Sequence, residues 1–140
     1  MVKTPLSFED IDSSLISLAG LTNAAYSAQM FLLPKQQHQL YYEDHVNECP
    51  QWQQWWATGL AMNTVSAFSF NPRTLTKAQK KTVLKACGTN YAIASGIIAK
   101  QMADGDFKKP IGFATIGFIG LQSMACFARA FRKDDEDGEK

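Results

Sequence analysis

Four long windows of this chain contain no ionisable side chain, and they constrain its fold more than any other feature. Residues 13–34, 49–72, 86–99 and 110–128 lack Asp, Glu, Lys, Arg and His, and together they make up 79 of the 140 residues. An amphipathic helix of a soluble protein normally carries charge on its solvent-facing side. Here the corresponding positions hold Ser, Thr, Asn, Gln, Ala and Gly. The pattern predicts four helices that cross a membrane.

The expected fold is all-α: an integral membrane four-helix bundle, a single domain over 1–140, with both termini on the same side. A span needs about 20 residues to cross about 30 Å of hydrocarbon. The expected spans are 13–34, 52–72, 82–103 and 110–128, followed by a disordered charged tail at 133–140. The mean hydropathy of −0.19 is low for a membrane protein and favours the alternative, a soluble four-helix interaction module.

Capping residues and prolines predict where these helices begin and end. Ser7, followed three residues later by Asp10, indicates a helix start near Ser7, and Pro34 ends that helix. Pro110 opens the last helix after a tight turn at 104–109. The polar connection at 35–50 is expected to form a short helix at the membrane surface.

Basic residues divide unevenly between the two sides of such a bundle. Ten Lys and Arg fall on the side that holds both termini, and four fall on the other side. The positive-inside rule then places the termini in the cytoplasm, stroma or matrix. The connection at 35–50 faces the opposite compartment.

No catalytic motif is present, so the expected protein is not an enzyme. The chain has no HExxH, GxSxG, CxxC or glycine-rich phosphate loop. Its net charge of +1 gives no electrostatic case for nucleic acid. A transporter usually needs an ionisable residue inside the membrane, and the four windows have none.

Amides inside the windows and two histidines outside them are the candidate cofactor ligands. Two interpretations of the amides stay open: hydrogen bonds between helices, and ligation of the magnesium of a chlorophyll, which accepts oxygen and nitrogen donors. No dedicated protein metal site is expected. The candidate ligands are His38, His45, Asn63, Asn90 and Gln122.

An aromatic cluster in and after the connection at 35–50 is the candidate partner contact. It comprises Tyr41, Tyr42, Trp52, Trp55 and Trp56. Protein interfaces favour Tyr and Trp because these side chains bury a large area at small entropic cost. Anchoring at the lipid headgroups explains the tryptophans equally well.

The stretch LPKQQHQLYYEDH followed by PQWQQWWATGLAMN resembles small four-helix membrane proteins of algal plastids. The resemblance covers residues 33–63. It implies an accessory subunit in the thylakoid that contacts photosystem core or antenna proteins and lipid, with chlorophyll and carotenoid at its periphery. Antenna helices of the chlorophyll a/b type carry Glu-x-x-x-Arg, which this chain lacks. The alternatives are a respiratory-complex accessory subunit of the mitochondrial inner membrane and a membrane scaffold for enzymes.

Overall fold

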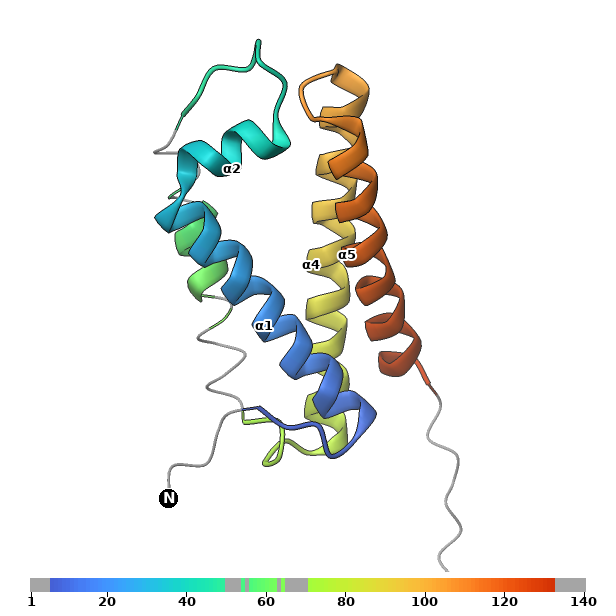
Figure 1. Ribbon diagram of the computed structural model, residues 1–140. Helices are drawn as coiled ribbons and strands as arrows, with labels where there is room; N and C mark the ends of the chain where they lie inside the picture. Colours follow the sequence, from blue (N-terminus) through green and yellow to red (C-terminus); the bar gives the residue numbers. More distant parts are fainter. Residues whose placement is uncertain (1–5, 50–53, 55, 63, 65–70, 133–140) are drawn as a thin grey trace, which may run out of the picture.

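The described part of the chain is helical, which confirms the predicted all-α class. The structure is a computed structural model that describes residues 6–49, 54, 56–62, 64 and 71–132. Its helices are α1 (Ile11–Leu32), α2 (Pro34–Tyr41), α4 (Lys77–Asp104) and α5 (Lys109–Ala130) (Figure 1). Residues 54, 56–62 and 64 are also helical. Within these ranges there is no strand, only a single bridge between Tyr42 and Phe107.

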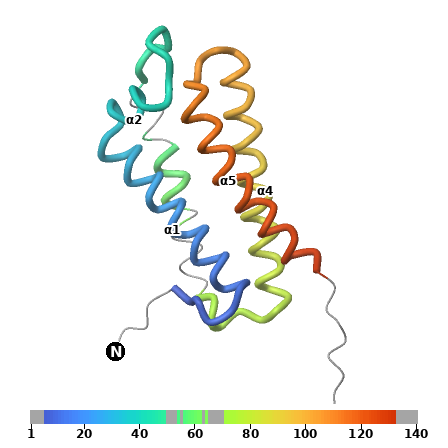
Figure 2. Tube along the Cα trace, turned by 45° about the vertical axis from the view of Figure 1, so that its right-hand side comes forward, coloured from blue at the N-terminus to red at the C-terminus, as the bar shows by residue number. Residues whose placement is uncertain are grey.

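Helices α4 and α5 form an antiparallel hairpin that makes the most extensive contact between elements (Figures 1 and 2). A capping box between Thr76 and Gln79 starts α4. Gly105 ends it with a φ of 86°, in the left-handed region that glycine adopts without a steric penalty. Pro110 lies in the first turn of α5, where its missing N–H has no helical partner to lose. The predicted tight turn at 104–109 is confirmed.

Helix α1 begins at Ile11, four residues later than predicted. Asp10 is its N-cap and accepts a 2.8 Å hydrogen bond from the Ser13 amide. Ser7 instead forms two hydrogen bonds with Ser17, a helical residue of α1. The Ser7 amide donates to Ser17 Oγ, and the Ser17 hydroxyl donates to the Ser7 carbonyl, both at 2.9 Å. Two overlapping capping signals compete here, and the one adjoining the apolar run prevails. At the other end, α1 stops at Leu32 before Pro34, as predicted.

Polar side chains join the helices in the interior. Ser123 Oγ of α5 donates to the Gly88 carbonyl of α4 at 2.7 Å. Gln122 Nε2 donates to Thr22 Oγ1 of α1 at 3.0 Å. Apolar side chains fill the space between these bonds in three clusters, centred on Ile16 and Leu84, on Tyr91 and Ile119, and on Met102 and Phe107.

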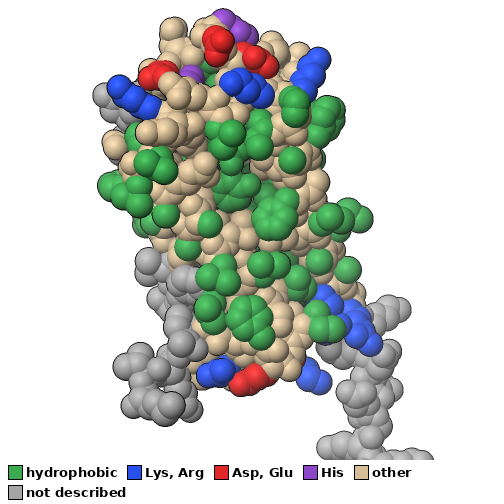
Figure 3. All heavy atoms as spheres, in the orientation of Figure 1, with side chains coloured by type: hydrophobic (Ala, Val, Ile, Leu, Met, Phe, Trp, Pro, Cys, Tyr) green, Lys and Arg blue, Asp and Glu red, His purple; other side chains and the backbone are tan. Residues whose placement is uncertain are grey.

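On the face that Figure 3 shows, charged side chains gather at the two ends of the bundle, and the described surface between them is uncharged. The lower end of Figure 1 comprises the starts of α1 and α4 and the end of α5. There Asp12 pairs with Arg129 at 2.6 Å and Asp10 with Lys80 at 2.8 Å. The described residues of this end include seven Lys and Arg and three carboxylates. Those of the upper end include four Lys and five carboxylates. The first and last described residues also lie at the lower end.

By length and composition, α5 alone among the described helices is apolar enough to cross a membrane. Helix α1 is rich in Ser, Thr, Asn and Gln, and α4 carries lysines in its first turns. Ten of the 21 residues of the predicted span at 52–72, and the whole tail at 133–140, lie outside the described residues.

Gly88 is expected to tolerate no larger side chain. A Cβ built at this position lies 3.1 Å from the Phe127 ring, whereas one at Gly117 of α5 meets nothing within 4 Å. Gly88→Val should therefore lower the free energy of unfolding by about 1–3 kcal/mol. Gly117→Val, the matched control, should change it by less than about 0.5 kcal/mol. Thermal unfolding in detergent micelles measures both, and equal effects would contradict this account of the α4–α5 contact.

Acid should weaken the lower end through Asp10. Partial burial raises the pKa of Asp10, but the hydrogen bonds from Lys80 and Ser13 prevail and lower it from 3.8 to about 2. The folded chain therefore binds this proton less readily than the unfolded chain, so the stabilisation is present above pH 3.8 and is lost as the pH falls toward 2. Because the carboxylate is half-exposed, the contribution is small. Asp10→Asn should reduce the loss of stability between pH 4 and pH 2, while the exposed-site control Asp44→Asn should not.

Candidate functional site

All four tyrosines of the chain line one partly open cavity near the upper end of the bundle. Tyr26, Tyr41, Tyr42 and Tyr91 come from α1, α2, the residue after α2, and α4. The cavity, called here the tyrosine cavity, has a volume of about 210 Å³ and lies between α1, α2, α4, α5 and the helical residues 56–62. Trp56 and Phe107 add two further aromatic rings to its wall.

The polar groups of the tyrosine cavity are uncharged. Among the described residues, no Asp, Glu, Lys, Arg or His lines it, and four amides do: Asn23, Gln37, Asn90 and Gln101. Gln37 is only 4% exposed, and its Oε1 accepts no hydrogen bond. Leaving a buried acceptor without a partner lowers the free energy of unfolding by about 1–3 kcal/mol, so this amide oxygen is an unfavourable feature of the fold.

The phenols near the upper end remain neutral at physiological pH. Burial, and then the neighbouring Tyr26, raise the pKa of Tyr41 to about 12. Burial also raises the pKa of Tyr42, although a hydrogen bond with Gln101 opposes the shift. The cavity therefore has neutral walls that offer hydroxyl and amide groups.

Two loops contact each other at the upper end, beside the cavity. The Glu43 amide donates to the Asp106 carbonyl at 2.9 Å, and the Lys108 amide donates to the Tyr41 carbonyl at 2.8 Å. The ring of Phe107 lies edge-on to Tyr42 at 5.3 Å and tilted against Tyr41 at 5.5 Å. These contacts fix the turn after α2 against the turn between α4 and α5.

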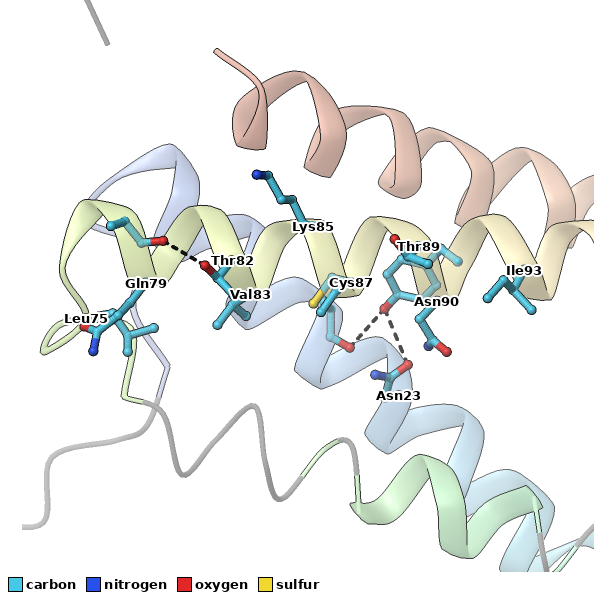
Figure 4. Close-up of a pocket in the computed structure, with 14 residues that line it drawn as sticks. Asn23, Leu75, Gln79, Thr82, Val83, Lys85, Cys87, Thr89, Asn90 and Ile93 are labelled. Carbon is cyan, nitrogen blue, oxygen red and sulfur yellow. Dashed lines mark hydrogen bonds between the residues drawn. The ribbon is translucent and has the colours of Figure 1, made fainter. Parts of the chain in front are cut away.

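A larger groove of about 930 Å³ runs along the first half of α4 (Figure 4). Asn23 and Asn90 line this groove as well as the tyrosine cavity, so the two spaces adjoin. Tyr91 lies between them, and its hydroxyl is 3.1 Å from the Ala19 carbonyl and 3.5 Å from Asn23 Oδ1. Lys85 is the only charged residue among the groove-lining residues.

The candidate cofactor ligands do not converge. His38 is buried in α2 with its Nε2 3.0 Å from the Val46 carbonyl, and His45 is exposed, 3.3 Å from Asp106. Gln122 donates to Thr22 on the far side of the bundle core, and Asn90 is exposed on α4. Asn63 lies outside the described residues. Within the described ranges no three His, Cys, Asp or Glu lie close enough to hold a metal ion.

The candidate partner residues differ in their exposure. Tyr41, expected at the surface, is 7% exposed and belongs to an interior cluster with Met102 and Phe107. Tyr42 is half-buried, and Trp56 is 56% exposed. Trp52 and Trp55 lie outside the described residues. Of the described members, Trp56 offers the largest accessible side chain.

Comparison with protein-family models, with curated proteins and with solved structures finds no match for this chain. The site is therefore interpreted from its own geometry. Sequence analysis did not identify Tyr26, Tyr91, Gln37 or Gln101 as site residues. One signal was available in the sequence. Every tyrosine falls in α1, in α2 or the residue after it, or in α4, and these segments all contribute to the upper end of the bundle.

Proposed function

We propose that this chain is an integral membrane protein, a non-enzymatic subunit that bridges neighbours in a large energy-transducing membrane complex. The observation that supports the membrane assignment is the polarity of the bundle, which is inverted relative to a soluble protein. Hydroxyl and amide side chains lie inside, and large apolar side chains lie outside. Water would solvate such an outer surface poorly, whereas hydrocarbon would solvate it well.

Helix α1 shows the inversion within one element. Its buried residues include Ser13, Ser17, Thr22, Asn23 and Ser27. Its exposed residues include Ile11, Leu18, Leu21, Phe31 and Leu32. The mean hydropathy of the whole helix includes the inward polar residues, so it is lower than the hydropathy of the outward face alone. The composition of α1 therefore understates how apolar its outer surface is.

Helix α5 repeats the arrangement. Thr115, Gln122 and Ser123 are buried, whereas the outward side carries an apolar stripe. The stripe, called here the α5 outer face, comprises Phe113, Phe118, Leu121, Met124 and Phe131, of which Leu121 and Met124 are each 69% exposed. Soluble monomers rarely expose so continuous a row of large apolar side chains.

The uncharged band has the dimensions of a bilayer. At 1.5 Å per residue, the interval from Lys85 to Lys100 on α4 is about 22 Å, and that from Lys109 to Arg129 on α5 is about 30 Å. Hydrocarbon is about 30 Å thick, and lysine stems reach from within it to the headgroups. The more basic lower end then faces the cytoplasm, stroma or matrix.

An algal photosystem with its antennae is the first choice of complex, in the thylakoid. A respiratory complex of the mitochondrial inner membrane and a membrane scaffold for enzymes are the alternatives. The bridging role is supported by glycines that face outward: a Cβ built at Gly96 of α4 or Gly117 of α5 meets nothing within 4 Å, so another helix could approach closely there. Peripheral chlorophyll and carotenoid remain part of the proposal, with exposed His45 and Asn90 as the ligands most accessible from outside.

A spin label at position 121 tests the membrane assignment. In a variant whose three cysteines are replaced by Ala, Leu121→Cys carries the label on the α5 outer face and Lys35→Cys carries it at the upper end. In lipid vesicles, label 121 should collide with oxygen, which concentrates in hydrocarbon, and not with a nickel chelate, which stays in water. Label 35 should show the reverse. Equal nickel accessibility at the two sites would support the soluble module instead.

Trp56→Ala tests the bridging role. Blue-native electrophoresis of mildly solubilised membranes should show the wild-type chain in a band far larger than its own mass. Loss of a central interface tryptophan costs about 2 kcal/mol or more, so Trp56→Ala should weaken association at least about thirtyfold. Phe113→Ala, with a similarly exposed ring on another helix, is the control for loss of apolar area. Migration of the wild-type chain alone would contradict the proposal.

A further inference from the structure

The larger groove, which runs along the first half of α4, passes from the charged lower end of the bundle into the uncharged band (Figure 4). Its volume is about 930 Å³. Toward the lower end, Gln79, Thr82 and Lys85 line it. Beyond Lys85, the lining residues on α4 are uncharged: Ala86, Cys87, Thr89, Asn90, Tyr91 and Ile93. A membrane lipid has the same order, with a polar head followed by hydrocarbon chains.

The length of the uncharged part of the groove fits one leaflet of a bilayer. At 1.5 Å per residue, Lys85 and Ile93 are about 12 Å apart along α4. Hydrocarbon is about 30 Å thick, so one leaflet contributes about 15 Å. Ile93 is 58% exposed, so the deep end of the groove is open at the side of the helix. An acyl chain beside α4 therefore reaches this end while its headgroup stays level with Lys85.

Lys85 provides charge complementarity for an anionic headgroup. It is the only charged residue that lines the groove, and among the described residues no carboxylate pairs with it. Its ammonium lies 5.0 Å from the centroid of the Phe131 ring, and Figure 4 shows the side chain directed toward α5. Arg73, Lys80 and Arg129 of the same end each pair with a carboxylate. Exposed basic residues at a membrane surface attract anionic lipids.

Thr89 offers a hydrogen-bond donor within the uncharged band. Four other helical threonines donate their hydroxyls to the carbonyl four residues earlier: Thr58, Thr64, Thr82 and Thr115. Within the described part of the chain, the exposed Thr89 hydroxyl has no such partner. A polar group without a partner is unfavourable in hydrocarbon. Thr89 lies about 6 Å deeper than Lys85 along α4, at the depth of the ester carbonyls that follow a phosphate headgroup.

We propose that the larger groove binds one anionic phospholipid of the leaflet at the lower end. Lys85 pairs with the phosphate, the Thr89 hydroxyl donates to an ester carbonyl, and an acyl chain lies along α4 toward Ile93. The inference rests on the membrane assignment of the proposed function and adds a ligand to it. A helix of a partner subunit would fill the same groove without needing an anion, so the two occupants give different results.

Two matched lipids test the wild-type chain. The purified protein in detergent micelles is titrated with dioleoyl phosphatidylglycerol, which is anionic, and with dioleoyl phosphatidylcholine, which has the same chains and no net charge. Native mass spectrometry measures the lipid retained. Micelles are used because an anionic bilayer attracts every basic residue of the lower end. We expect one phosphatidylglycerol per chain, bound about fivefold more tightly than phosphatidylcholine. Equal retention of the two lipids would overturn the proposal.

Variants locate the site. Lys85→Gln should lower the affinity for phosphatidylglycerol about fivefold and leave that for phosphatidylcholine unchanged. Lys77→Gln, at an exposed lysine of the same end that does not line the groove, should alter neither affinity. Ala86→Phe fills the groove and should abolish retention of both lipids. Ala92→Phe, at an exposed alanine of α4 outside the lining, is the control for added bulk. Circular dichroism establishes that each variant is folded.

The remaining outcomes separate this site from its alternatives. Excess inorganic phosphate should not displace the lipid, because the acyl chain contributes to binding; displacement would show an ion site alone and overturn the proposal. Undiminished affinity in folded Lys85→Gln would show that Lys85 does not hold the phosphate. The spin label at position 121 reports the membrane assignment independently. A label exposed to hydrocarbon, together with no retained phosphatidylglycerol, would contradict the lipid site and leave the membrane assignment intact.

Discussion

The bundle depends on polar contacts buried between its helices. Each pair among the three long helices has at least one: Ser123 to the Gly88 carbonyl joins α5 to α4, Gln122 to Thr22 joins α5 to α1, and the Tyr91 hydroxyl to the Ala19 carbonyl joins α4 to α1. Such bonds contribute about 1 kcal/mol or less each in a membrane, so their main effect is geometric. They specify which faces of the helices meet and leave the apolar faces outside.

The same contacts explain why mean hydropathy understates how apolar the outer surface of the bundle is. A polar side chain directed inward lowers the mean hydropathy of its helix but does not make the outer surface more polar. Ser17 and Asn23 have this effect in α1, and Thr115 and Gln122 have it in α5. Helix α5 is still apolar enough to cross a membrane, because only three of its residues have hydroxyl or amide side chains. Helix α1 has more hydroxyl and amide side chains and is not apolar enough by this measure.

Local signals in the sequence were sufficient for most helix ends. Pro34 and Pro110 act through the backbone of their own turn, and Gly105 can take its positive φ without a neighbour's help. Asp10 was misassigned because two capping signals overlap there and the one adjoining the apolar run prevails. The tyrosine cavity was missed because its residues are distant in sequence. Tyr26 and Tyr91 become neighbours only through the packing of α1 against α4, and no periodicity in the sequence encodes that.

The two spaces of the bundle have different walls. In the lower half, glycine and serine let α4 and α5 approach until the Gly88 carbonyl accepts from Ser123, and the larger groove lies along α4 beside Ala19 and Asn23 of α1. In the upper half, Tyr41, Tyr42 and Phe107 meet at tilted or edge-on angles. The aromatic residues that hold the upper loops together therefore also form part of the cavity wall.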